Sequence, residues 1–386
     1  MRTLHRAGHR DVATAVDAEP GADLLSVSDL NVTFATPRGA LRAVDRVSFD
    51  VRVSETLGVV GESGSGKSVL LRSVMGLLKP SVAERTGSVV FEGVEQVGRA
   101  RRDLRRYWGR EMSIVFQDPM TSLNPVVRVG RQLSESVRPN SSGPTNVTER
   151  CVELLRAVGI PEPRRRLRQF PHELSGGMRQ RVAIAIALAG NPRLLLADEP
   201  TTALDVTVQA QILDLLSDLR DEFRLAMILV SHDLGVVANR TDKIVVMYAG
   251  QVVEAAPTRV LFESTRMPYT EALLRSIPRL DGERHARLFS ISGRPPNLLG
   301  PQVGCRFAPR CVYAQPKCRE QEPPLVPADR ADHLYRCWFP VGTDAGRAAL
   351  ERNRTLDLHP VRMTMLLDTP PDSAPRLAPP TDPGTD

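Results

Sequence analysis

The sequence predicts an α/β protein whose core is a parallel sheet covered by helices on both faces. Two segments, LLLA at 194–197 and AMILV at 226–230, are apolar at every position. Strands buried on both faces have this composition, whereas half-exposed antiparallel strands alternate apolar and polar residues. Residues with helical spacing lie between these strands, and a glycine-rich loop at 61–68 separates an earlier strand from a helix. This strand–helix alternation is typical of a doubly covered parallel sheet.

The other elements follow in chain order. Residues 25–51 alternate as an antiparallel ribbon does, with a turn at 36–39. A short strand at 55–60 leads into the glycine loop, and helical spacing follows over 68–78. Later we expect a hairpin at 86–97, helices at 177–189, 205–222 and 258–278, and strands at 112–116, 193–197, 226–230, 243–247 and 250–254.

Length and composition divide the chain into four parts. With 386 residues, 41% of them hydrophobic, it is long enough for more than one domain. We expect a flexible extension at 1–24, a main domain at 25–265 with a helical subdomain at about 120–175, a cysteine-bearing module at 266–345, and a disordered tail at 346–386 that is rich in Pro, Arg and Asp.

The composition also excludes some classes of protein. No apolar run approaches the ~18–20 residues of a membrane span. The start MRTLHRAGHR has no apolar segment of a signal peptide, so we expect a cytosolic protein. The net charge is +6, but the basic residues are scattered, which favours solvated faces or partner contacts over a nucleic-acid surface.

A phosphate-binding loop is predicted at 61–68, GESGSGKS, between a strand and a helix. Glycines let successive backbone N–H groups surround phosphates, and the helix N-terminus favours an anion. Lys67 is placed to bridge β- and γ-phosphates, and the Ser68 hydroxyl to bind Mg²⁺. The predicted nucleotide-binding residues here are Gly61, Glu62, Ser63, Gly64, Ser65, Gly66, Lys67, Ser68 and Val69.

Two carboxylates end the apolar strand at 194–198. Asp198 suits Mg²⁺, directly or through water, and Glu199 can orient and polarise a water against a γ-phosphate. A helix-capping acid pair is the alternative, but the phosphate loop favours the catalytic interpretation. His232 follows another strand and can contact the γ-phosphate, although a histidine there can be structural. Gln117 follows the strand at 112–116 and can reach Mg²⁺ and the attacking water; a surface glutamine is the alternative.

The segment LSGGMRQ at 174–180 opens a helix, so its backbone N–H groups and the Ser175 hydroxyl are available to an anion. Because the chain has its own phosphate loop elsewhere, we expect that anion to be held by a second protein.

Together these motifs resemble the nucleotide-binding subunits of ABC transporters over residues 25–265. The resemblance implies that two such domains pair head to tail, so that Ser175, Gly176 and Gly177 of one cover ATP in the other. It also identifies Asp205 as a D-loop residue. An aromatic residue stacks on adenine in this family; Phe34 is the candidate, although core packing would explain it equally well.

FQDPMTSLNP at 116–125, PHELSGGMRQRVAIA at 171–185 and ADEPTTALDVTVQAQIL at 197–213 narrow the resemblance to di-/oligopeptide and nickel importers. That branch has a C-terminal extension like this one, although Met267 stands where its usual histidine precedes Pro-Tyr-Thr. The resemblance implies ATP and Mg²⁺ as ligands. It also implies a second ATPase subunit, identical or homologous, two membrane permeases, an extracytoplasmic binding protein, and a peripheral position on the cytoplasmic face of the membrane.

Cys305, Cys311, Cys318 and Cys337 form a C-x5-C-x6-C-x18-C pattern. In a cytosolic chain disulfides are disfavoured, so four thiolates suggest zinc or an iron–sulfur cluster. The spacing lacks C-x2-C knuckles and suits a cluster better; four reduced thiols are the alternative. Similar extensions in peptide-importer ATPases bind a [4Fe–4S] cluster, so the resemblance implies one on these residues.

The expected function is therefore ATP hydrolysis that powers uptake of dipeptides or oligopeptides, with nickel or glutathione as alternative cargo. A soluble ABC ATPase acting on nucleic acid or ribosomes is the alternative from another class. Members of that class have a long insertion in the domain or two ATPase cassettes in one chain. Here Gln117 and Ser175 are close in sequence and there is one cassette, which disfavours this alternative.

Overall fold

The computed structural model describes residues 22–118, 122–140, 146–202, 204–277 and 291–355. Most of the predicted N-terminal extension and of the predicted tail therefore lies outside the described residues. The chain forms two compact units and passes between them several times. Among the described residues, the first unit contains 22–26, 50–56 and 90–230, and the second contains 27–49, 57–89 and those from 231 onward.

The first unit is built on three parallel strands, β6 (Met112–Val115), β7 (Leu194–Asp198) and β8 (Ala226–Ser231). β7 pairs in parallel with both neighbours, since Met112 and Ala226 lie opposite Leu194. All residues of β7 and β8 are buried. The structure thus confirms the predicted parallel pairing of the LLLA and AMILV segments.

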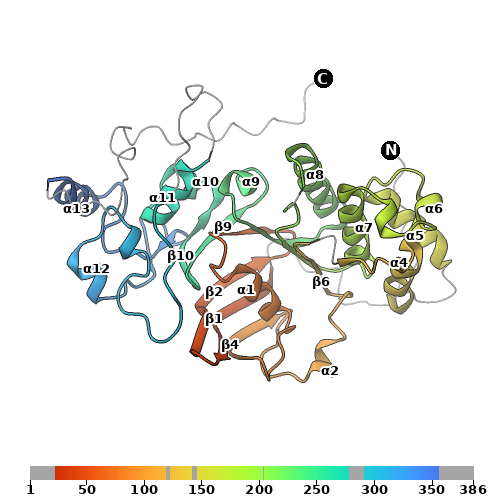
Figure 1. Ribbon diagram of the computed structural model, residues 1–386, viewed down its shortest axis with the longest axis horizontal. Coiled ribbons are helices and arrows are strands. Elements are labelled where there is room, and N and C mark those ends of the chain that lie inside the picture. The colour runs from red at the N-terminus through yellow and green to blue at the C-terminus, as the bar shows by residue number, and fades with distance from the viewer. Residues whose placement is uncertain (1–21, 119–121, 141–145, 203, 278–290, 356–386) are drawn as a thin grey trace. The chain divides into compact units, whose positions relative to one another are not determined.

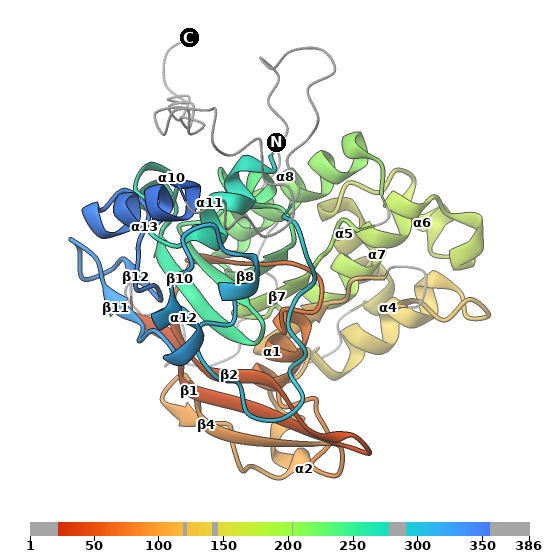
Figure 2. The same ribbon diagram turned by 60° about the vertical axis from the view of Figure 1, so that its left-hand side comes forward.

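Helices account for most of the remainder of this unit. The predicted helical region contains α4 (Val129–Val137), α5 (Val147–Ala157) and α6 (Pro163–Arg166), and α4 and α5 pack against the longer α7 (Gly176–Leu188). These helices lie together in both views (Figure 1, Figure 2). The unit also contains α2 (Arg101–Leu104), α8 (Val206–Phe223) and β5 (Val94–Glu95), the latter paired with the end of β4 (Ala83–Phe91).

The second unit contains a mixed sheet in the order β11-β12-β10-β9-β3. Its strands are β3 (Thr56–Val60), β9 (Lys243–Tyr248), β10 (Gln251–Pro257), β11 (Val326–Pro327) and β12 (Leu334–Tyr335). β3 and β9 are parallel, and the remaining pairs are antiparallel. Because β3 ends in the phosphate loop, which continues into α1 (Lys67–Val74), that loop follows the carboxyl end of a buried parallel strand.

The predicted ribbon is present as β1 (Asp23–Thr36) and β2 (Gly39–Arg52), neighbours in a sheet of order β2-β1-β4. These three strands lie side by side in Figure 2. The two residues between β1 and β2, Pro37 and Arg38, form a turn, and so short a connection requires antiparallel strands.

The C-terminal part departs from two predictions. A single helix was expected over 258–278, but there are two, α10 (Thr258–Glu263) and α11 (Pro268–Arg275). Pro268 is the first residue of α11, where its missing N–H costs nothing, whereas within one continuous helix it would remove a hydrogen bond. The segment also contains α9 (Leu234–Val237) and α12 (Pro316–Glu320).

The second departure is α13 (Asp344–Thr355), which occupies residues we expected to be disordered. Its polar composition gave no sign of burial, yet Ala349 is fully buried. Asn353 Nδ2 donates hydrogen bonds to the carbonyls of Val312 and Ala314 at 2.6 and 3.0 Å. Tertiary hydrogen bonds therefore order this helix. None of the helices in the described part of the chain has the length and apolar character that crossing a membrane requires.

Candidate functional site

The phosphate loop of the second unit has a backbone that requires glycine. Gly66 lies at the N-cap of α1 with φ 100°, in the left-handed region. A Cβ at this position would lie 2.4 Å from the carbonyl oxygen of Ala43. With no side chain at the N-cap, the first turn of α1 faces the loop as a helix N-terminus that favours an anion.

Two buried polar side chains of this loop fit a phosphate ligand. Lys67 is 4% exposed, and its Nζ donates to the carbonyls of Gly61 and Glu62 at 2.6 and 3.0 Å. Ser65 Oγ is buried and makes no hydrogen bond to the described residues. An unpaired buried hydroxyl costs about 1–3 kcal/mol, so an oxygen-rich anion would satisfy it. These residues therefore fit the predicted triphosphate.

In the first unit the structure brings Gln117 and Glu199 together. Gln117 Nε2 donates to Glu199 Oε2 at 2.9 Å, and Thr202 Oγ1 donates to the same oxygen at 3.0 Å. Glu199 has φ 45°, a left-handed conformation that is uncommon for a residue with a side chain. Two donors and a constrained backbone thus fix the carboxylate in one orientation. Thr202 was not predicted, because a threonine after the acid pair has no distinctive spacing.

Asp198 is the last residue of β7 and is 1% exposed. Its carboxylate therefore lies at the carboxyl end of a buried strand, the edge where ligands gather in parallel sheets. The alternative was that Asp198 and Glu199 cap the helix that follows them. That helix, α8, is instead capped by Asp205, whose Oδ1 accepts a hydrogen bond from Val208 N at 2.9 Å.

The LSGGMRQ segment opens α7 as expected, with Ser175 as an exposed N-cap. Its Oγ accepts from Met178 N at 3.3 Å, so the hydroxyl oxygen caps its own helix, a role we did not predict. Gly176 and Gly177 form the first turn. A Cβ on Gly177 would lie 2.7 Å from Val208 Cγ1, so glycine permits α7 to approach α8 closely.

His232 and Phe34 lie in the second unit. His232 is exposed and follows β8; the next residue, Asp233, caps α9 by accepting from Gly235 N at 2.7 Å. Phe34 lies on β1 and is half-buried. Its ring is therefore neither part of the fully buried core nor freely exposed, and its role at adenine stays a prediction.

The phosphate loop is also bound by the C-terminal module, through a contact that the sequence did not indicate. Arg310 and Glu62 form a two-pronged ion pair, with Nη1–Oε2 at 2.6 Å and Nη2–Oε1 at 2.8 Å. Tyr269 Oη accepts from Glu62 N at 2.8 Å. No motif marks Arg310; its position beside Cys311 was the one available signal.

A second polar cluster surrounds Asp45 of β2, which is 1% exposed. Arg306 and Arg46 form ion pairs with it, and Gln251 Nε2 donates to it at 3.0 Å. Burial acts to raise the pKa of Asp45, but the positive charges of Arg306, Arg46 and Arg42 lower it below its usual value. The carboxylate is therefore kept charged in the interior.

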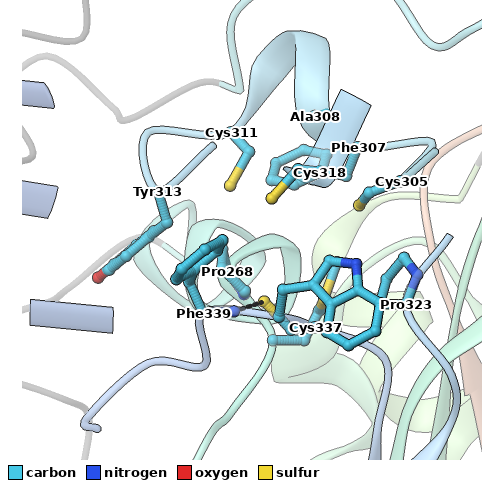
Figure 3. A pocket seen from close by; sticks show the side chains of 12 residues that line it. Pro268, Cys305, Phe307, Ala308, Cys311, Tyr313, Cys318, Pro323, Cys337 and Phe339 are labelled. Atoms are coloured by element: carbon cyan, nitrogen blue, oxygen red, sulfur yellow. Dashed lines mark hydrogen bonds between the residues drawn. The ribbon is translucent and has the colours of Figure 1, made fainter. Parts of the chain in front are cut away.

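The four C-terminal cysteines line one cavity in the second unit, together with apolar side chains that include Phe307, Trp338 and Phe339. In Figure 3 Cys305, Cys311 and Cys318 lie on one side of it and Cys337 on the other. Cys305 N donates to Cys318 O at 2.7 Å, and Cys337 Sγ accepts from Phe339 N at 3.3 Å. Thiols are the donors that iron–sulfur clusters use, so the donor type at this cavity, as distinct from its arrangement, matches such a cluster.

Burial raises the pKa of these thiols, to about 11 for Cys305, and at Cys311 the charges of Cys337 and Cys305 raise it further. Four thiolates are thus unfavourable here without a bound cation. Among the residues that the structure describes, however, no group of three or more His, Cys, Asp or Glu side chains is arranged to hold a metal ion. Neither zinc nor the implied [4Fe–4S] cluster is supported by this arrangement, so the cluster stays a prediction.

Comparisons with known proteins agree with these motifs. The family described as "ABC transporter" matches residues 44–202, and the family "Oligopeptide/dipeptide transporter, C-terminal region" matches residues 253–318. The chain is 49% identical over 330 residues to the oligopeptide transport ATP-binding protein OppD of Salmonella typhimurium, covering 85% of this chain and 97% of the relative. For OppD of Bacillus subtilis the identity is 47% over 318 residues, covering 82% and 88%.

Solved structures resemble the chain over its ATPase part. A dimeric post-hydrolysis state of the ATP-binding cassette MJ0796 bound to ADP and Pi has a TM-score of 0.55 and 28% identity, covering 61% of this chain and 99% of that one. CbiO1 from Clostridium perfringens, part of the transporter complex cbiONQ, has a TM-score of 0.53 and 28% identity, covering 64% and 92%. The predicted fold is therefore confirmed, and the chain belongs to the ABC transporter ATPases, in the group of the oligopeptide transport ATP-binding proteins.

Proposed function

We propose that this chain is the ATP-binding and ATP-hydrolysing subunit of an ABC importer for oligopeptides or dipeptides. The observation that carries the proposal is the pair of constrained sites, the buried Lys67 in the phosphate loop and the oriented carboxylate of Glu199. The name of a relative that is 49% identical, and the match of the C-terminal region to a peptide-transporter family, support peptides as cargo. An ATPase that acts on nucleic acid or ribosomes is the alternative. It is not favoured, because the relatives and the C-terminal family named above are those of peptide transporters.

The phosphate loop binds the nucleotide in this proposal. Lys67 exchanges the carbonyls of Gly61 and Glu62 for the β- and γ-phosphate oxygens, and the first turn of α1 adds backbone N–H donors. Ser65 Oγ, Gly64 and Gly66 complete the loop, and Phe34 stacks on adenine. Ser68, Gln117 and Asp198 would hold Mg²⁺, whose charge neutralises the β- and γ-phosphate oxygens.

Hydrolysis then depends on Glu199. Its carboxylate accepts a hydrogen bond from the attacking water and takes up a proton from it as the water oxygen bonds to the γ-phosphorus. The bond from that phosphorus to the β,γ-bridging oxygen breaks, ADP leaves, and the proton passes from the carboxylate to the phosphate formed. Gln117 and Thr202 hold the carboxylate in place for this step. His232 hydrogen-bonds the γ-phosphate and so distinguishes ATP from ADP.

The assembly we propose contains a second ATPase subunit, identical or homologous, two membrane permeases and an extracytoplasmic binding protein, with this chain on the cytoplasmic face of the membrane. Ser175, Gly176 and Gly177 cover the ATP of the partner ATPase, since they open a helix at an exposed N-cap, and Asp205 belongs to the D-loop. The exposure of Ser175 supports this role; Gly176 and Gly177 are half-buried. No nucleic-acid partner is proposed.

We further propose that Cys305, Cys311, Cys318 and Cys337 hold a [4Fe–4S] cluster. The support is the donor set, four thiols that line one apolar cavity. Iron and acid-labile sulfide are to be measured on anaerobically purified chain, with Cys311→Ser as a matched variant. Absence of both elements from the parent chain would reject the cluster.

The ATPase assignment is tested by equilibrium binding of Mg-ATP and by phosphate release from the full chain. Lys67→Ala is expected to lose nucleotide binding, because no other buried cation is provided by the loop. Arg330→Ala is the matched control, since that arginine is exposed and pairs with Asp332 of the C-terminal module. Unchanged ATP affinity in Lys67→Ala would contradict the proposal.

A further inference from the structure

We propose that Arg310 is a positioning residue for the phosphate loop, through which the cysteine-bearing module tunes nucleotide affinity. The inference rests on the proposed ATP site and deepens it, because it adds a segment nearly 250 residues away in the chain to the support of that site.

The first step is the strength of the contact. Arg310 approaches Glu62 with both Nη atoms, at 2.6 and 2.8 Å, and only 4% of its side chain is exposed. Planar two-pronged pairs of this kind fix direction as well as distance, which a lysine cannot reproduce. The guanidinium is itself held, since Nε donates to Ser292 O at 2.9 Å and Nη1 to Tyr248 Oη at 3.2 Å.

The second step leads from Glu62 to the phosphate-binding cation. Glu62 is held at three points: its carboxylate by Arg310, its N–H by Tyr269 Oη at 2.8 Å, and its carbonyl by Lys67 Nζ at 3.0 Å. The residue that Arg310 orients thus supplies one of the two carbonyls that position Lys67. A shift of Glu62 would displace the ammonium that is to bind the β- and γ-phosphates.

A second path reaches the same loop from the same module. Arg306 Nη1 donates to Ala249 O at 2.5 Å, and the neighbouring Gly250 N donates to Ser65 O at 2.9 Å. Arg306 directly follows Cys305, and Arg310 directly precedes Cys311. Each arginine that supports the loop is therefore the sequence neighbour of a cysteine that lines the cavity. A rearrangement of the cavity moves both supports at once.

The test compares two buried arginines of the module in the full chain. Arg310→Met removes the contact with Glu62, whereas Arg336→Met removes a similarly buried arginine, next to Cys337, that pairs with Glu322. Mg-ATP affinity is expected to fall at least about ten-fold in Arg310→Met and to change less than about two-fold in Arg336→Met. The Mg-ATP affinity of Arg310→Lys is expected to lie between those of the parent chain and Arg310→Met, because the positive charge remains and the two-pronged contact is lost.

Glu62→Gln tests the same contact from the other side if Arg310→Met does not fold. It is expected to weaken Mg-ATP binding in the same direction. Where Arg310→Met does fold, combining the two substitutions is expected to add little, since both remove one interaction. An additive double variant would contradict coupling through this pair.

A second readout uses linkage, which is reciprocal for binding free energies. If the loop and the cavity are coupled, saturating Mg-ATP slows alkylation of Cys311 in metal-free full chain, and Arg310→Met abolishes that protection. A parent chain that binds ATP, together with an Arg310→Met variant of equal affinity and equal protection, would overturn this inference alone. A folded parent chain that binds no ATP would instead overturn the proposed function.

Discussion

The substitution Glu199→Gln isolates the charge of the proposed catalytic carboxylate. Gln117 Nε2 and Thr202 Oγ1 both donate to the same atom, Oε2, at 2.9 and 3.0 Å. The substituted amide keeps one oxygen that can accept from both donors, so the local structure is expected to persist. What is lost is the negative charge and basicity on which orientation and polarisation of the attacking water depend.

The expected loss of kcat is the contribution of a carboxylate held in position beside the attacking water. Positioned acid–base groups contribute about 10²–10⁴-fold to rate, equivalent to about 2.7–5.4 kcal/mol of activation free energy. We therefore expect kcat of Glu199→Gln to fall by about that factor while the Kd for Mg-ATP stays within about three-fold, because the phosphate loop is unchanged. Phosphate release under saturating ATP and equilibrium nucleotide binding measure the two quantities separately.

Thr202→Val serves as the matched control, because it removes one of the two donors and leaves the carboxylate. A hydrogen bond to a charged group contributes about 1.5–3 kcal/mol, which converts to about 10- to 150-fold in rate, so the loss in kcat is expected to lie in that range and below the loss in Glu199→Gln. Normal turnover in Glu199→Gln would refute the catalytic role, and a larger loss in Thr202→Val would assign the chemistry elsewhere.

Three further predictions concern the fold and the thiols. Gly66→Ala is expected to lose ATP affinity and about 1–3 kcal/mol of stability in denaturant unfolding, because φ is 100° and the Cβ would meet Ala43 O; an unaltered unfolding midpoint would contradict this. Asp45→Asn is expected to destabilise the chain by about 3–5 kcal/mol at neutral pH, since it removes the carboxylate that pairs with the buried Arg306. The pKa of Asp45 is lower in the folded state than its unfolded value of 3.8, so its contribution is present above that pH and is lost as the pH falls through the folded value, where parent and variant stabilities converge. Because burial raises the pKa of Cys151 to about 11, its alkylation at pH 8 is expected to be far slower in the native chain than in urea, and equal rates would show that it is accessible.

Local patterns predicted most of the fold. The buried strands β7 and β8 and the helices α7 and α8 were predicted to within one or two residues, because a continuous apolar run marks a strand buried on both faces and a capping residue marks the start of a helix. The phosphate loop was predicted for the same reason. The break before Pro268 was missed because apolar residues recur at helical spacing on both sides of it.

Contacts between distant segments could not be predicted in this way. The ion pair between Glu62 and Arg310, and the hydrogen bonds that order α13 through Asn353, join residues whose sequence neighbourhoods contain no matching pattern. The hydrogen bond between Gln117 and Glu199 could have been predicted, since both residues follow buried strands of a parallel sheet. The four cysteines were evident from sequence, but the apolar cavity they line depends on side chains from several segments.

The buried cluster around Asp45 limits how this protein can be shortened. A fragment ending near residue 265 would keep the motifs of the ATPase domain but would lack Arg306, leaving an interior carboxylate with much of its compensating charge removed. The C-terminal region is therefore part of the folded core of the second unit and not a detachable appendage. A homologue that lacks this region would need an uncharged residue at the position of Asp45, or another cation beside it.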